Sequence, residues 1–250
     1  MLDGIKRWLS GASSAVPTGY EGIVAWAQGN QSTFRGVQDE GFVIDGRLGS
    51  TAWRLEWGPS QRPYISGHEL RLRADTGVEP ELQLLVLSRE LQEQLEKSIF
   101  EQYVEDVQTR IDNQTPPEMR WLVMFPKLPG SDMVALRENF VAVGNGKSWL
   151  QSWLRGALSQ ALALRAAQSN APLVLMIGRG RLMLRTAMED PTVPELQRVL
   201  ALFETALREA SRVANDNPRG LSDSSAPPSG GSEWGASTAA RPGDDSTPRG

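Results

Sequence analysis

The stretch TAWRLEWGP at residues 51–59 alternates between large apolar and charged side chains. Because successive side chains of a β-strand point to opposite faces, Arg54 and Glu56 fall on one face and the bulky residues on the other. The apolar face consists of Thr51, Trp53, Leu55 and Trp57. After a Gly58-Pro59 turn the pattern returns, with Tyr64, Ser66, His68, Leu70 and Leu72 opposite Ile65, Glu69, Arg71 and Arg73. Two such strands predict an antiparallel sheet that is covered on one side.

Short apolar runs elsewhere in the chain predict further strands. The runs are 23–27, 42–44, 82–87, 121–125, 139–143, 173–177 and 182–186. Asp45-Gly46 predicts a hairpin turn after the run 42–44, because this dipeptide readily adopts the backbone of a tight turn. Gly178-Arg179-Gly180 predicts a hairpin with a three-residue loop between the last two runs.

Three long segments have the periodicity of amphipathic helices instead. They are residues 88–112, residues 147–168, and a last helix that begins with Thr192 and Glu195 in the spacing of a capping box. Together these patterns predict an α+β fold, in which mostly antiparallel sheet packs against three long amphipathic helices. Strands precede a long helix in both halves, so the sequence leaves open a duplication of two similar halves with a boundary near 113–118.

Composition divides the chain into three parts. Residues 1–18 predict a short amphipathic helix and a Gly/Ser/Pro-rich linker, and this helix would dock through Leu2, Ile5, Trp8 and Leu9. Residues 19–213 form the α+β globular region. Residues 214–250 are rich in Ser, Gly, Pro, Asp and Ala. We expect a disordered tail there, because such a segment cannot bury enough apolar surface to offset the entropy of ordering it.

Overall composition argues against several classes of function. The 250 residues include no cysteine and one histidine, which removes thiol nucleophiles and zinc sites built from Cys or several His ligands. The formal net charge of −4 gives no long-range attraction to nucleic acid. No apolar run approaches the ~20 residues of a membrane span, and residues 1–16 lack the apolar core of a signal peptide. We therefore expect a cytoplasmic protein with no metal or cofactor and no nucleic-acid partner.

The segment GNGKS at residues 144–148 ends like a phosphate-binding loop and lies between a predicted strand and a predicted helix. Such a loop needs a glycine five positions before Gly146, where this chain has Val141. We therefore interpret the segment as a tight turn into a helix, with a weaker anion site at Lys147 and Ser148 as the alternative.

The histidine, the aromatic residues and the acidic residues are also candidates for functional sites, but packing or solvation explains them more simply. His68 has no second histidine with which to share a metal, and we expect it at the edge of the core, bonded to backbone. Trp53, Trp57 and Tyr64 could stack on nucleic-acid bases, but the alternation places the aromatic residues opposite most of the arginines, so we expect them in the core. Seven carboxylates lie on the polar face of the predicted 88–112 helix, where we expect them to be solvated.

Arg179, Arg181 and Arg185 form the densest cationic spot, and an acidic partner surface or a phosphate could dock there. The alternative is a solvated hairpin tip. The sequence thus favours a non-catalytic module that binds another macromolecule, most simply a protein. Two other functions stay open. One is an enzyme with Asp/Glu chemistry or an anionic-substrate site near Lys147 and residues 179–185. The other is membrane-surface contact through the helix in residues 1–18.

Overall fold

The computed structural model describes residues 19–37, 41–104 and 115–216. Its strands are β1 (Thr33–Val37), β2 (Gly41–Leu48), β3 (Thr51–Pro59), β4 (His68–Asp75), β5 (Leu84–Ser88), β6 (Phe140–Gly144), β7 (Leu173–Gly178) and β8 (Arg181–Ala187). Its helices are α2 (Glu21–Gly29), α3 (Arg89–Val104), α4 (Pro117–Met124), α5 (Lys147–Trp153), α6 (Ala157–Gln168) and α7 (Val193–Asp216), with a 3₁₀ turn at Gly130–Asp132. The predicted α+β class is confirmed.

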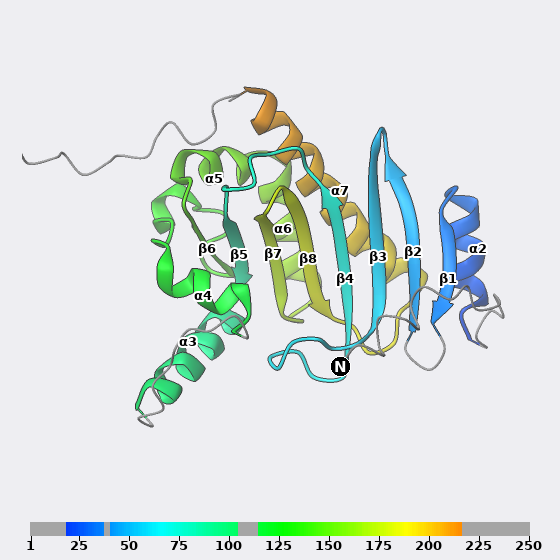
Figure 1. Cartoon of the computed structure of the whole chain (residues 1–250), viewed down its shortest axis with the longest axis horizontal. Helices are drawn as coiled ribbons and strands as arrows, with labels where there is room; N and C mark the ends of the chain where they lie inside the picture. The colour runs from blue at the N-terminus through cyan, green and yellow to red at the C-terminus, as the bar shows by residue number, and fades with distance from the viewer. Residues whose placement is uncertain (1–18, 38–40, 105–114, 217–250) are drawn as a thin grey trace, which may run out of the picture.

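All eight strands form one antiparallel sheet in the order β1-β2-β3-β4-β8-β7-β5-β6 (Figure 1). β4 pairs with β8, and β5 lies between β7 and β6, so strands from both halves of the sequence share the same sheet. The hydrogen bonding is therefore continuous between segments on both sides of residues 113–118. The duplication of two similar halves stays a prediction.

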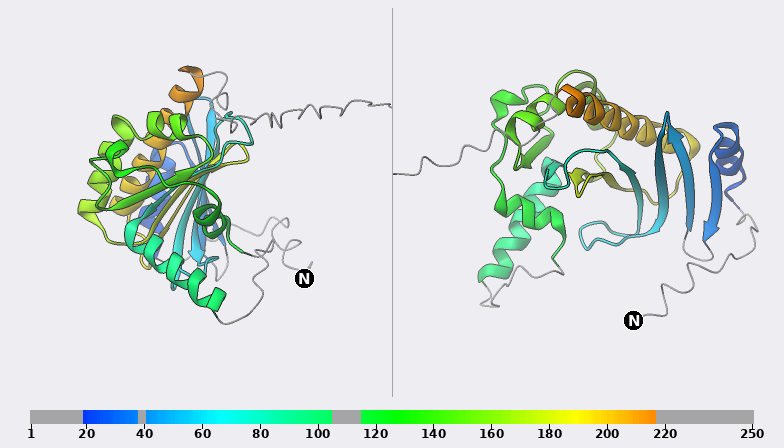
Figure 2. Two further views of the ribbon diagram at one scale, coloured as in Figure 1. Left: turned by 90° about the vertical axis from the view of Figure 1, so that its left-hand side faces the viewer. Right: turned by 45° about the horizontal axis from the view of Figure 1, so that its top comes forward.

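One face of this sheet is covered by α2, α5, α6 and α7 (Figure 2). The long helix α7 contributes the largest apolar stripe, which consists of Leu196, Val199, Leu202, Phe203, Ala206, Leu207, Ala210 and Val213. Its first turn is capped as the sequence predicted, because the Glu195 N–H donates to the Thr192 hydroxyl at 3.4 Å. The indole N–H of the fully buried Trp153 donates to the carbonyl of Ala206 at 3.0 Å, which joins α5 to α7.

The opposite face is covered only in part, by α3 and α4. These two helices pack on the apolar side chains of β5, β6 and β7, and Leu91, Leu95 and Trp121 are among their buried contacts. Figure 1 shows α3 extending away from the sheet at the β6 end, and no described helix lies in front of β1 to β4. Both faces of the sheet therefore have a helical layer near β5–β7, whereas β1–β4 and β8 have one on a single face.

Two short runs predicted as strands are helices. Residues 23–27 lie in α2, where Ile23 and Ala27 are buried one turn apart. Residues 121–124 lie in α4, which begins at Pro117. Proline suits a first helical turn, because the N–H that it lacks would have no partner there. Five apolar residues in a row fit either a strand or a helix, so these two predictions were wrong.

Three further predictions need correction. The expected 147–168 helix is interrupted between α5 and α6, where Gly156 has a φ of 65°. Asp45 and Gly46 lie inside β2, and the chain turns instead at Gly49, which has a φ of 57°. Residue 46 is a glycine for a different reason, because a Cβ there would be 2.2 Å from the ring of Trp53. The β7–β8 hairpin is confirmed, but Gly178 pairs with Arg181, which leaves a two-residue loop.

Several predictions fall outside the described residues. They are the helix and linker of residues 1–18 with Leu2, Ile5, Trp8 and Leu9, residues 105–112 of the predicted 88–112 helix, and the tail from residue 217 onward. Residues 214–216, predicted as the start of that tail, belong to α7. Within the described ranges, no helix is both long enough and apolar enough to cross a membrane.

Candidate functional site

On the partly covered face of the sheet, the paired residues are mostly charged at the β1 end and apolar at the β6 end. One row crosses all eight strands and consists, from β1 to β6, of Arg35, Val43, Glu56, Arg71, Arg185, Val174, Leu87 and Val141. Its last three members are apolar and lie in the half that α3 and α4 cover. Its first five members are mostly charged and lie in the half over which no described helix packs.

We call the half over which no described helix packs, formed by β1–β4 and β8, the open face. Its cationic side chains are Arg35, Arg47, Arg54, Arg71, Arg73, Arg181 and Arg185, and its carboxylates are Asp45, Glu56, Glu69 and Asp75. Seven arginines against four carboxylates give this face a net charge of +3, whereas the whole chain carries −4. The open face is therefore cationic on an anionic protein.

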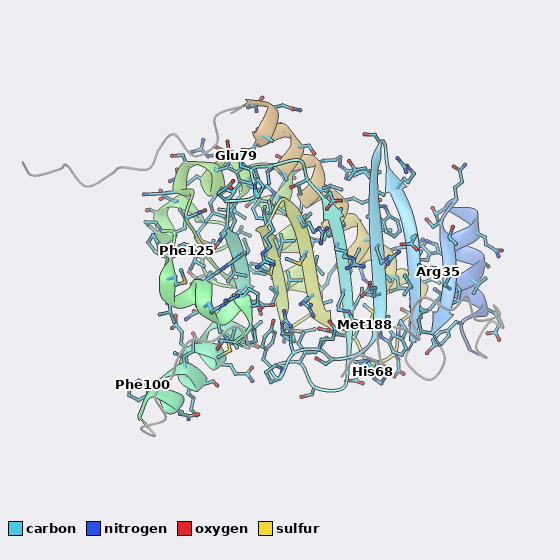
Figure 3. The ribbon with its side chains drawn as sticks, in the orientation of Figure 1. Arg35, His68, Glu79, Phe100, Phe125 and Met188 are labelled. Carbon is cyan, nitrogen blue, oxygen red and sulfur yellow. The ribbon has the colours of Figure 1, made fainter. Side chains whose placement is uncertain are left out.

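Near β1 the charges form a partly solvated ladder. Asp45 accepts hydrogen bonds from Arg35 at 2.7 Å and from Arg54 at 2.6 Å. Partial burial would raise the pKa of Asp45, but the hydrogen bonds from Arg54 and Arg35 outweigh it and lower that pKa. Figure 3 shows Arg35 at the β1 edge of the molecule. Its side chain is 51% exposed, so it remains accessible to a partner while Asp45 fixes its position.

Near β8 the charges form a buried group that we call the inner cluster. Its members are Arg62, Tyr64, Glu69, Arg71, Glu118 and Arg185. One oxygen of Glu69 accepts from Arg71 at 2.9 Å, from Arg185 at 2.8 Å and from the Gln61 N–H at 3.0 Å. Both carboxylates of the cluster, Glu69 and Glu118, are fully buried.

Glu118 brings α4 into the inner cluster. One of its oxygens accepts from Arg62 at 3.0 Å and from the Tyr64 hydroxyl at 2.9 Å. Burial raises the pKa of Tyr64, and the charge of Glu118 raises it further, so this hydroxyl stays a donor. The cluster thus ties β4, β8, α4 and the loop before β4 together, at the border between the covered half and the open face.

The inner cluster is arranged as a structural brace. One oxygen of each of its two carboxylates is held by charged donors, and a buried charge that is paired in this way resists rearrangement. Two surface pockets, one beside Arg165 and one beside Arg208, are lined by no residue of the cluster. Among the described residues, no group of three or more His, Asp or Glu side chains is placed to hold a metal ion.

The five residues of the predicted anion site come from separate elements and have separate partners. Lys147 lies 3.5 Å from Asp132, and it and Ser148 begin α5. Arg179 is in the β7–β8 loop, Arg181 lies 2.9 Å from Asp75, and Arg185 belongs to the inner cluster. Neither pocket is lined by any of these five residues. An anionic-substrate site here stays a prediction, and only Arg181 and Arg185 lie on the open face.

The aromatic residues lie inside, and the histidine has a different partner from the one expected. Trp53 and Trp57 are 5% and 7% exposed and lie in the larger apolar core, so they form no stacking platform. His68 stacks on Trp57 with ring centroids 4.7 Å apart. Its Nδ1 lies 3.3 Å from a carboxylate oxygen of Glu189, not against backbone.

Sequence reasoning missed Glu118 as a site residue. It follows Pro117 in a segment where only the run 121–125 attracted attention, and nothing local marks it as buried. The charged face of 51–59, in contrast, was visible in the alternation and lies where that pattern indicated. No protein-family model, curated protein or solved structure matches this chain.

Proposed function

We propose that this protein is a non-catalytic binding module that docks an acidic segment of another protein on its open face. The observation that carries the proposal is the net charge of +3 on the open face, over which no described helix packs, within a chain whose net charge is −4. Such an asymmetry attracts an acidic surface to this side of the molecule and orients it before contact.

The arginines that would make contact are partly exposed and partly fixed. Arg35, Arg73 and Arg181 have side chains that are 51%, 48% and 58% exposed, and each lies within 3.2 Å of a carboxylate of the same face. A planar guanidinium can hold one carboxylate and still offer donors to a second. Because strands position these groups, little further ordering is needed on binding.

The residues of the open face favour a protein partner rather than a nucleic acid. Readers of single-stranded nucleic acid combine cations with exposed aromatic rings. Here Trp53 and Trp57 point to the opposite side of β3 and are buried. The face also carries four carboxylates among its arginines, which would repel closely spaced phosphates. An acidic polypeptide spaces its charges more widely and can match this mixed pattern.

Fluorescence anisotropy with a labelled octaglutamate peptide tests the proposal. We expect binding at low salt that weakens as salt rises, and a loss of roughly tenfold or more in the variant Arg35→Gln/Arg73→Gln/Arg181→Gln. The matched control is Arg155→Gln/Arg198→Gln/Arg208→Gln, which removes the same charge from exposed residues of the helical layer. Equal losses in the two variants, or tighter binding to a single-stranded oligonucleotide than to the peptide, would overturn the proposal.

A further inference from the structure

A pocket of about 160 Å³ lies at the end of the sheet where β5 finishes and β7 and β6 begin. Its walls come from the first turn of α3, the end of α6 and the segments that precede β6 and β7. The buried side chains of Phe140 and Leu173 form an apolar wall. The pocket shares no residue with the open face, so an inference about it is independent of the proposed function.

Arg165 of α6 lines this pocket and is 9% exposed. Its guanidinium donates to the Ser169 carbonyl at 3.2 Å and to the Thr186 hydroxyl at 3.1 Å, and both of these acceptors are neutral. Its Nε has no acceptor, and in the described part of the chain no carboxylate lies within ion-pair distance of it. A buried cation without a counter-ion is rare, because leaving water costs it several kcal/mol.

The inner cluster shows how this chain treats other enclosed arginines. Arg71 and Arg185, with side chains 16% and 13% exposed, each lie within 2.9 Å of the Glu69 carboxylate. Arg165 is buried to a similar degree and has no such partner. Burial lowers the pKa of Arg165, the nearby Arg198 lowers it further, and Glu195 opposes them. Its surroundings therefore favour the arrival of a negative group.

The other charged residues that line the pocket are Arg89, Glu90 and Glu93 of α3 and Glu138 before β6. Arg89 is half-buried, and its guanidinium donates to the Arg137 carbonyl. The three carboxylates are exposed, and Glu138 lies 3.1 Å from Arg137. The pocket therefore has two arginines, of which Arg165 is buried, and three solvated carboxylates. These carboxylates would repel a dianion such as phosphate, whereas a molecule with one charge of each sign can pair with both an arginine and a carboxylate.

We propose that this pocket binds a small free amino acid, with its carboxylate on Arg165 and its ammonium group among the glutamates. The pocket volume of about 160 Å³ favours an amino acid with a short side chain, such as that of alanine, serine or valine. Ser169 and Asn170, at the end of α6, supply further polar groups for the carboxylate. The apolar wall of Phe140 and Leu173 accommodates a short side chain.

Isothermal titration calorimetry on the full chain tests this proposal with L-alanine, L-serine and L-valine as probes. Isovalerate lacks the ammonium group of L-valine, and isobutylamine lacks its carboxylate. We expect at least one of the amino acids to bind, isovalerate to bind several-fold more weakly, and isobutylamine to give no signal. The proposal is overturned if none of the three amino acids binds, or if inorganic phosphate binds more tightly than they do.

Variants locate the site. Arg165→Gln should weaken amino-acid binding at least tenfold, and Arg208→Gln, which removes an exposed arginine from α7, should leave it unchanged. Because Arg165 also joins α6 to β8 through Thr186, a second variant keeps the test decisive if the first fails to fold. Glu93 is on the surface, and Glu93→Gln should weaken the binding of L-valine several-fold while leaving that of isovalerate unaffected. Equal effects on both ligands would contradict the assigned orientation.

Discussion

One half of the partly covered sheet face is apolar and lies under helices, whereas the other half is charged. At β5, β6 and β7 the face carries Leu85, Leu87, Val141 and Val174, and α3 and α4 bury them. At β1–β4 and β8 the same rows carry arginines and carboxylates, and no described helix packs over them. A strand face can therefore be protected from water by a helix or adapted to water by charge. The inner cluster lies at the border between the two halves.

The difference is also energetic. Apolar burial contributes roughly 25 cal/mol per Å² without regard to direction. Exposed ion pairs contribute about 0–1 kcal/mol each and are screened by salt. The covered half should hold the fold together, and the open face should be more tolerant of substitution and free to bind.

Breaking the brace at the border should have the largest effect. Glu118→Ala would leave Arg62 without its buried counter-ion and the Tyr64 hydroxyl without its acceptor, and we expect a loss of about 3–5 kcal/mol in the free energy of unfolding. Urea denaturation followed by tryptophan fluorescence measures it. Asp45→Ala is the control on the exposed ladder, with an expected loss of about 0–1 kcal/mol. Similar losses in the two variants would show that the cluster is no brace.

Truncation of the covered half should rank next. Leu87 is fully buried beneath α3 and α4, so Leu87→Ala should cost about 2–5 kcal/mol. Val43 belongs to the same row on the open half and is 4% exposed, although no described helix lies over it. Val43→Ala removes two carbons and should cost about 1–2 kcal/mol. A larger loss at Val43 than at Leu87 in urea denaturation would contradict the division.

A smaller change at the border tests how closely α4 fits. A Cβ on Gly178 would lie 2.6 Å from the ring of Trp121, which packs from α4. Gly178→Ala should therefore cost about 1–3 kcal/mol by overpacking. Thermal unfolding measures the loss, and Trp121→Phe in the same background should recover part of it by making room. No recovery would mean that the ring is not the obstacle.

The smallest expected effect is the pH dependence of the open ladder. The pKa of Asp45 is lowered in the folded protein, so its contribution to stability is present above the unfolded pKa and is lost as pH falls through the folded pKa. The difference in stability between the wild type and Asp45→Asn should be at most about 1 kcal/mol at pH 7. It should vanish well below the ordinary Asp pKa of about 4. Urea denaturation at a series of pH values measures it, and a difference that grows on acidification has the wrong sign.

The sequence pattern alone identified which side chains of the long elements face the core. The alternation of residues 51–59 correctly placed Trp53 and Trp57 opposite Arg54 and Glu56. The periodicity from Leu196 to Val213 correctly gave the stripe of α7. Both patterns extend over enough residues to separate a period of two from one of 3.6. The runs 23–27 and 121–125 are too short for that distinction, and both turned out to be helical.

Which charged residues meet, and over which half of the sheet face helices pack, depends on the tertiary structure. Glu118 and Tyr64 are 54 residues apart in the sequence, and the buried bond between them depends on where α4 settles. Arg165 resembles any basic residue of a last helical turn until its packing against Thr186 is seen. Local periodicity fixes the direction in which a side chain leaves its own helix or strand. Its partners and its burial depend on distant segments, which the local pattern does not encode.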